Sequence, residues 1–195
     1  RYWRDWSSDV CSSDLVGWLV LCTNAFNLID GVDGLATGVG LVSALTILLS
    51  ALLQENLALA LAVAPLAGAL LGFLRYNFNP ASVFLGDSGS LLVGFLLGAY
   101  GVLWKQKTTT MVGMTAPLMV MAVPLFDTGI AVVRRFLRNK PIFGADRDHV
   151  HHRLLALGFS HRGVAFVLYA ACGIASVCSL LVSAFQQDYA AVVIL

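Results

Sequence analysis

Long runs without Asp, Glu, Lys or Arg are the feature that most limits how this 195-residue chain can fold. A helix needs about 20 apolar residues to cross about 30 Å of hydrocarbon. Four uncharged runs approach or reach that length, Leu35 to Leu53, Leu57 to Leu74, Ser88 to Trp104 and Gly163 to Phe185, and a fifth, Met111 to Val133, contains only Asp127. Because lipid cannot satisfy backbone N–H and C=O groups, such runs predict helices. We therefore expect an all-α fold, a polytopic transmembrane helical bundle.

Composition supports this class. Only 12% of the residues are charged, about half of the roughly 25% found in soluble domains. The net charge of +1 gives no basic excess for a nucleic-acid partner. The four cysteines lack metal-ligand spacing, so we interpret them as apolar fillers.

The two ends of the chain differ from the rest. Residues 1–15 form an atypical polar segment without an apolar signal-peptide core, and two interpretations stay open: a short polar terminus, or an artefactual stretch foreign to the gene. The run Val16 to Ile29 is too short to span untilted, and Ala190 to Leu195 would begin a seventh span. We expect a bundle that is incomplete at both ends.

The alternation of spans and links assigns polar residues to two faces. One face receives eight basic residues, Arg75, Arg134, Arg135, Arg138, Lys140, Arg147, Arg153 and Arg162, and the other only Lys105 and Lys107. The positive-inside rule makes the first face cytoplasmic. The same face or its vicinity receives Asp30, Asp33, Asp87, Asp127, Asp146, Asp148 and all four histidines. We expect the functional site there.

The first polar cluster contains Asn24, Asn27, Asp30 and Asp33 within twelve residues that also include two glycines. The i, i+3 spacing places both amides on one helix face, and the glycines allow the turn between the acids to bend tightly. Two carboxylates suit a divalent cation or the donor groups of a sugar nucleotide. The alternative is that Asp33 only caps the next helix, but the density of polar residues favours a functional role.

The second cluster, Phe84-Leu-Gly-Asp87-Ser-Gly-Ser90, directly precedes an apolar run. Free N–H groups and the helix dipole favour phosphate at such a helix start. Asp87 could hold Mg²⁺ there, and Phe84 could stack on a base. The alternatives are a plain N-cap and an interfacial aromatic side chain.

The third cluster lies in the longest polar segment and contains Asp146, Arg147, Asp148, His149, His151, His152 and Arg153. Its histidine spacing does not match the zinc pattern His-x-x-x-His, but histidine and arginine beside carboxylates suit diphosphate binding. A helix starting here would place His149, His152 and Arg153 on one side, with His151 elsewhere. Asp127, inside an apolar run, is a functional candidate or the partner of a residue such as arginine.

Four motifs occur in a fixed order: Asn-x-x-Asn-x-x-Asp-Gly-x-Asp-Gly-Leu, Phe-x-Gly-Asp-x-Gly-Ser, Pro-Leu-x-Asp and Asp-x-x-His-x-His-His-Arg-Leu. Over about Leu21 to Phe185 the chain resembles the polyprenyl-phosphate N-acetylhexosamine-1-phosphate transferase family, of glycosyltransferase 4 type. The form His-x-His-His-Arg-Leu-Leu resembles the branch that uses undecaprenyl phosphate and N-acetylglucosamine 1-phosphate to start teichoic acid, O-antigen and related glycans.

The resemblance implies an activity, partners and a location. The family transfers a sugar phosphate from a UDP-N-acetylhexosamine to undecaprenyl phosphate and releases UMP, with Mg²⁺, or Mn²⁺ in its place. The expected location is the bacterial plasma membrane with a cytoplasmic active site. Residues 16–195 would be the transmembrane catalytic domain, the C-terminal part of a larger enzyme. A homodimer is left open.

The resemblance also implies residue roles. The catalytic set is Asp30, Asp33, Asp87, His149, His151 and His152; Asn24, Asn27, Phe84, Arg147 and Arg153 bind substrate; and Asp87 and Asn27 face the metal. Phospho-N-acetylmuramoyl-pentapeptide transferase is the alternative within the family. A transporter or a non-catalytic membrane protein is the alternative outside it, although polar residues at one edge do not favour transport.

One departure from the family leads to a prediction. The family has a paired-aspartate motif on an earlier cytoplasmic loop, and no Asp-Asp pair occurs in this sequence. We therefore expect the 195-residue chain alone to show no transferase activity. The measurement is UMP release from UDP-N-acetylglucosamine and undecaprenyl phosphate, and detectable UMP from the purified chain would contradict the expectation.

Overall fold

The computed structural model describes residues 6–104, 118, 121–139 and 149–194, and all its regular elements within these ranges are helices. In chain order they are α1 (Trp6–Leu28), α2 (Leu35–Leu53), α3 (Leu57–Asn77), α4 (Gly86–Trp104), α6 (Ala122–Leu137), α7 (Val150–Ala156) and α8 (His161–Ile194). The prediction of an all-helical fold is confirmed.

Four of these helices have the length and composition to cross a membrane. They contain the segments Leu35–Leu53, Leu57–Asn77, Gly86–Leu103 and His161–Leu181. Each overlaps one of the four uncharged runs in the sequence. The boundaries follow from local chemistry: Gly34 adopts a φ of 78° before α2, and the Asn56 side chain accepts a hydrogen bond from the Leu59 N–H at the start of α3.

Three expectations need correction. Helix α1 begins at Trp6 rather than Val16, so part of the polar segment continues the helix. Helix α8 runs unbroken from His161 to Ile194, because no glycine or proline interrupts it near Asp188, and no separate span begins at Ala190. Helix α6 has 16 residues, about 24 Å, which is shorter than a span; residues 111–117 of the expected fifth span lie outside the described residues.

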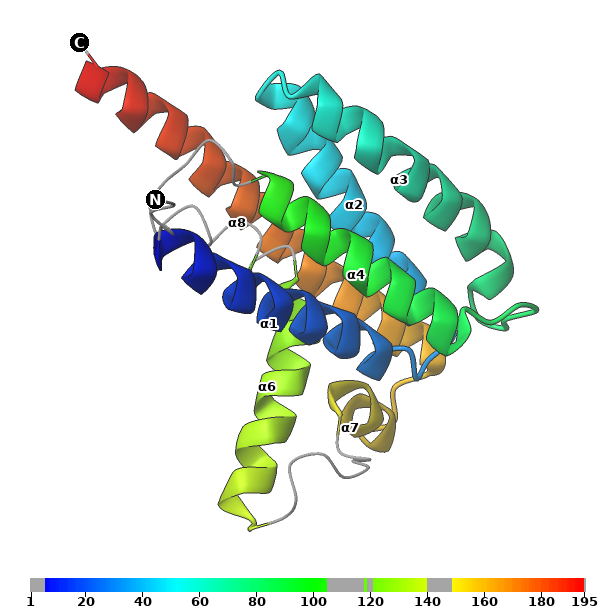
Figure 1. Cartoon of the computed structure of the whole chain (residues 1–195). Coiled ribbons are helices and arrows are strands. Elements are labelled where there is room, and N and C mark those ends of the chain that lie inside the picture. The colour runs from blue at the N-terminus through cyan, green and yellow to red at the C-terminus, as the bar shows by residue number, and fades with distance from the viewer. Residues whose placement is uncertain (1–5, 105–117, 119–120, 140–148, 195) are drawn as a thin grey trace.

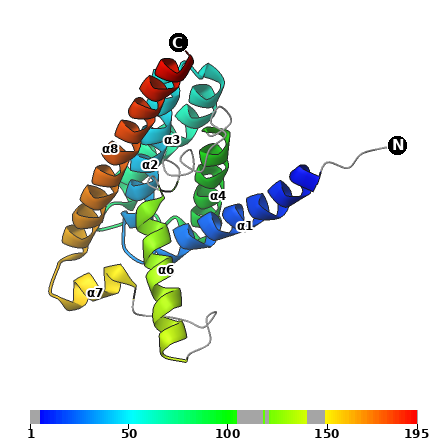
Figure 2. The ribbon, with the colours of Figure 1, turned by 90° about the vertical axis from the view of Figure 1, so that its left-hand side faces the viewer.

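Helix α2 lies at the centre of the bundle. It contacts α3, α4 and α8, and 72% of its span is buried, against 28% for α3 and 33% for α4 and α8. Figure 1 shows these helices side by side, whereas α6 leads away from the bundle toward the side of α7. Figure 2 shows that α1 lies at a steep angle to the other bundle helices and that its beginning points away from them. The links after α1 and α3 and the beginnings of α4 and α8 meet at one end of the bundle.

Close packing joins α1 to α4. A Cβ atom on Gly94 would lie 2.6 Å from Phe26 Cβ and 2.8 Å from the Cys22 carbonyl oxygen, and one on Gly98 would lie 2.9 Å from Cys22 Cβ. Small residues at this spacing let membrane helices approach closely. The Trp18 indole N–H adds a hydrogen bond of 3.0 Å to the Gly98 carbonyl oxygen. Glycine is therefore required on this face of α4.

We predict that Gly94→Ala separates α1 from α4 and lowers the stability of the protein by about 1–3 kcal/mol, the range for overpacked cores. Thermal unfolding in detergent, followed by circular dichroism, measures the effect. Gly68→Ala is the matched control, because nothing lies within 4 Å of a Cβ at this exposed position on α3. An equal melting temperature for Gly94→Ala and the parent protein would contradict the prediction.

Candidate active site

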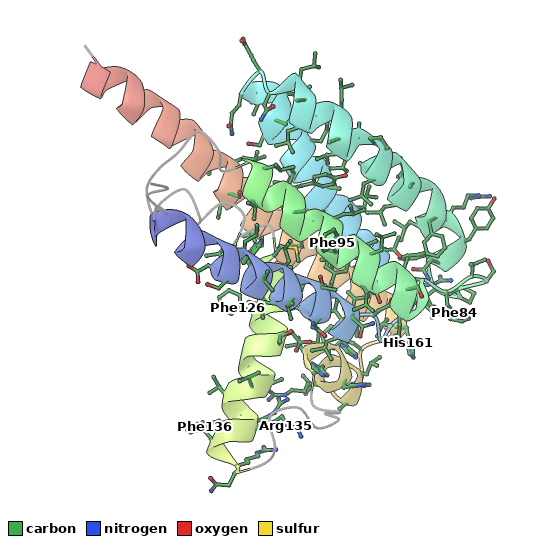
Figure 3. All side chains as sticks on the ribbon, in the orientation of Figure 1. Phe84, Phe95, Phe126, Arg135, Phe136 and His161 are labelled. Carbon is green, nitrogen blue, oxygen red and sulfur yellow. The ribbon has the colours of Figure 1, made fainter. Side chains whose placement is uncertain are left out.

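A polar cavity lies at the end of the bundle where the link after α1 meets the start of α4. It has a volume of about 250 Å³. Its wall includes Asp30 and Asp33 from the first motif, Phe84 and Asp87 from the second, and Asn77 from the end of α3. Figure 3 shows Phe84 at this end, near His161 at the start of α8. Two acidic motifs far apart in the sequence therefore share one cavity.

The two motifs contribute different surfaces to the cavity. The Phe84 ring is 71% exposed and Asp87 is also exposed, whereas Asp30 is half-buried. Burial, followed by the negative charge of Asp87, raises the pKa of Asp30 from 3.8 to about 6. A cation between the two carboxylates would offset both the burial of Asp30 and its repulsion by Asp87.

The donor set fits Mg²⁺ held together with a nucleotide. Mg²⁺ prefers oxygen ligands and is usually bound by one or two carboxylates together with phosphate oxygens and water. Asp30 and Asp87 supply such a pair. Among the described residues no group of three or more His, Cys, Asp or Glu could hold a metal ion, so a site made by protein side chains alone is absent from that part of the chain.

Asn27 connects α1 to the second motif. Its side-chain N–H donates to Asp87 Oδ1 at 3.1 Å and to Ser90 Oγ at 2.8 Å. The Ser90 hydroxyl in turn donates to the Gly86 carbonyl oxygen at 3.0 Å. Asn27 therefore orients the Asp87 carboxylate. Asn24 is exposed and donates to the Val20 carbonyl oxygen of its own helix at 2.7 Å, so the structure does not bring it into this group.

Asp33 is occupied by the link between α3 and α4. One carboxylate oxygen, Oδ2, accepts from the Asn79 side-chain N–H and from the Ala81 backbone N–H, both at 3.0 Å. The next residue, Gly34, accepts a hydrogen bond from the Tyr169 hydroxyl of α8. A Cβ on Gly38 would lie 2.1 Å from that tyrosine ring. Helix α8 thus packs against the turn that carries Asp33 and Gly34.

The histidine cluster is divided between the interior and the surface. His149 and His151 are 6% and 2% exposed, and their rings are parallel with centroids 5.9 Å apart. His149 Nδ1 lies 3.0 Å from Asp127 Oδ2. His151 Nε2 has no hydrogen-bond partner among the described residues and lies where a Cβ on Gly31 would be 2.5 Å away. The third motif therefore packs directly on the turn of the first.

This division corrects the expected helix face. His149 precedes α7 in extended backbone, so it is buried beside His151, while His152 and Arg153 are exposed. Burial, followed by the charge of His152, lowers the pKa of His151 from 6.5 to about 4. His151 is therefore neutral at physiological pH, and positive charge on this part of the surface is left to exposed residues such as Arg153. Arg147, with Asp146 and Asp148, lies outside the described residues.

Comparison with known proteins identifies the family. Residues 12–105 match the family described as Glycosyl transferase family 4. The chain belongs to this family. A probable undecaprenyl-phosphate N-acetylglucosaminyl 1-phosphate transferase of Bacillus subtilis is 44% identical over 78% of this chain and 42% of its own length.

Two further relatives represent different branches. A decaprenyl-phosphate N-acetylglucosaminephosphotransferase of Mycobacterium tuberculosis is 39% identical over 80% of this chain and 43% of its own length. A phospho-N-acetylmuramoyl-pentapeptide-transferase of Rubrobacter xylanophilus is 36% identical over 75% of this chain and 42% of its own length. The chain therefore spans less than half the length of these relatives.

Several residues around the candidate site were not assigned a role from sequence. Asn77 accepts from the Thr37 hydroxyl at 2.6 Å and donates to the Val83 carbonyl oxygen at 3.0 Å. Asn79 contacts Asp33, and Tyr169 contacts Gly34. The asparagines could have been found as polar residues at the end of an apolar run. Tyr169 has no comparable signal, because a tyrosine in a span is common.

We predict that Gly31→Ala displaces His151, because the added methyl group meets a ring that is buried and stacked. Amide exchange of α7, followed by mass spectrometry, should become faster while exchange of α2 stays unchanged. Gly129→Ala on α6 is the control, since nothing lies within 4 Å of a Cβ there. Unchanged protection of α7 in Gly31→Ala would show that the contact is not required.

Proposed function

We propose that this chain binds a UDP-N-acetylhexosamine in the cavity of Asp30, Phe84 and Asp87. The proposed reaction is transfer of N-acetylglucosamine 1-phosphate to a polyprenyl phosphate such as undecaprenyl phosphate, with release of UMP. The observation that carries the proposal is the convergence of two acidic motifs and an exposed aromatic ring on one polar cavity at the end of a bundle of candidate spans.

The nucleotide half of the donor has a matching surface. The exposed Phe84 ring offers a face on which uracil can stack, an interaction worth about 1–3 kcal/mol. Asp87 lies in the first turn of α4, where phosphate is favoured by the N–H groups of a helix start. We assign Phe84 to the base and Asp87, oriented by Asn27, to the metal that accompanies the diphosphate.

Mg²⁺ would neutralise the charge that gathers on the bridging oxygens as the bond to UMP breaks. The side chains around it have separate tasks. Asp30 lines the same cavity as Asp87, and Asp33 holds the link between α3 and α4 through its hydrogen bonds to Asn79 and Ala81. We assign His149 and His151 to shaping the diphosphate side, and His152 and Arg153 to supplying polar and charged groups there. Arg147 is given the same role from its sequence motif alone.

The acceptor requires an apolar surface that ends near charged groups. The outer face of α6 borders an open cavity of about 780 Å³ whose wall includes Phe126, Ile130, Val133 and Leu137. Arg134 and Arg138 line the same cavity where the helix ends. We propose that a polyprenyl chain lies along this face with its phosphate toward the arginines, at the cytoplasmic surface of a bacterial plasma membrane.

The relatives named above point to two different sugar donors. Identity is higher to the N-acetylglucosamine enzymes, at 44% and 39%, than to the muramoyl-pentapeptide enzyme, at 36%. We therefore propose UDP-N-acetylglucosamine as the donor. Stronger competition by UDP-N-acetylmuramoyl-pentapeptide would favour the second branch.

We predict that the purified chain in lipid nanodiscs binds UDP-N-acetylglucosamine in the presence of Mg²⁺ and loses this binding in EDTA. Asp87→Asn should weaken binding at least about 10-fold, the loss typical even for residues that only orient a metal ligand. Phe84→Ala should weaken it about 5- to 100-fold through lost stacking. Isothermal titration calorimetry measures the dissociation constants.

The control for these variants is Glu55→Gln, which alters an acid in the link between α2 and α3, at the other end of α2 from Asp33. Its binding should equal that of the parent chain. Equal binding by Asp87→Asn and the parent would remove the proposed cavity as the nucleotide site. The experiment measures binding rather than transfer, because the 195-residue chain alone is expected to show no transferase activity.

A further inference from the structure

Asp127 is a buried acid that the proposed nucleotide and lipid sites do not use. It lies on α6 and is 5% exposed. Its Oδ2 lies 3.0 Å from His149 Nδ1, and its Oδ1 accepts the Val150 N–H at 2.8 Å. Both oxygens of one side chain therefore hold the beginning of α7. The sequence suggested an arginine as one partner for this acid, and the structure shows a histidine.

The contact fixes the orientation of His149. An ionised carboxylate only accepts hydrogen bonds, so the proton on this side of the imidazole must lie on Nδ1. The His149 ring then stacks in parallel on the His151 ring. The tip of His151 reaches Gly31, which lies between Asp30 and Asp33. A continuous series of contacts thus leads from α6 to the acidic turn.

Stability alone does not account for a carboxylate at this position. Asp127 borders a cavity of about 290 Å³ whose wall is otherwise mainly apolar, with Phe126, Ile130 and Leu168 among its members. Replacing a buried ion pair by apolar residues is often neutral or stabilising. A side chain with two directed acceptors is useful here because it sets the position of α7.

We propose that Asp127 is a positioning residue, which holds His149 and the start of α7 so that the segment His149 to Arg153 faces the diphosphate of the donor. The assignment rests on the proposed function, because only the affinity of a diphosphate-bearing ligand would depend on the position of this segment. The affinity for uridine, which lacks the diphosphate, should not depend on it.

The test compares UDP and uridine as ligands of the full chain in nanodiscs with Mg²⁺. Asp127→Ala should weaken UDP binding about 10-fold, the size expected when hydrogen bonds to a charged group are lost, and leave uridine binding unchanged. The double variant Asp127→Ala/His149→Ala should bind UDP no more weakly than His149→Ala, because residues that act through one another are not additive. Amide exchange of α7 should become faster in Asp127→Ala.

The matched control is Thr128→Val. This neighbour on α6 has a buried hydroxyl without a hydrogen-bond partner in the described part of the chain, so the binding of both ligands and the exchange of α7 should be unaffected. Equal losses of UDP and uridine, additive losses in the double variant, or unchanged α7 exchange would each overturn the proposal. If the parent chain binds neither ligand, the proposed function fails and the positioning role toward the donor fails with it, while exchange still decides whether Asp127 holds α7.

Discussion

The close approach of α1 and α4 is the contact on which the candidate site depends. Asn27 can reach both Asp87 and Ser90 only because Gly94 and Gly98 let the two helix backbones come together. In a membrane, close packing of this kind does much of the work that the hydrophobic effect does in water, since lipid is as apolar as the side chains. Glycines in the middle of α4 therefore allow a side chain of α1 to orient a carboxylate at the start of α4.

The polar groups at this end of the bundle divide into those that hold the structure and those that face the cavity. Asp33 and Asp127 each accept two hydrogen bonds that fix a neighbouring segment. Asp30 and Asp87 instead line the same cavity, where burial, followed by the negative charge of Asp87, raises the pKa of Asp30. Carboxylates are costly to bring together without a cation, and this cost is the physical reason for assigning a ligand to this pair in the proposed site.

The sequence predicted the spans well and the tertiary contacts poorly, for a physical reason. Uncharged runs decide where a chain can cross lipid, and α2, α3 and α4 follow them closely. The polar motifs also predicted that Asp30 and Asp87 would share a surface, because an even number of spans between them returns the chain to the same side of the membrane. Which side chain each acid would contact depends on helix rotation and crossing angle. The sequence therefore could not show that Asp33 holds Asn79, that His151 packs on Gly31, or that α8 continues through Asp188.

The histidine cluster shows how burial changes the chemistry that a motif suggests. From its sequence alone, the motif His-x-His-His-Arg suggests several cationic side chains around a diphosphate. In the fold, His151 is neutral at physiological pH because burial lowers its pKa to about 4, and His149 is bound to Asp127. Positive charge on this surface is then left to exposed groups such as Arg153, and the packing of the buried imidazoles fixes the start of the helix that carries them. In the proposed site, one motif therefore contains residues of two kinds: the buried pair would set the geometry, and the surface residues would supply the electrostatics that a bound diphosphate requires.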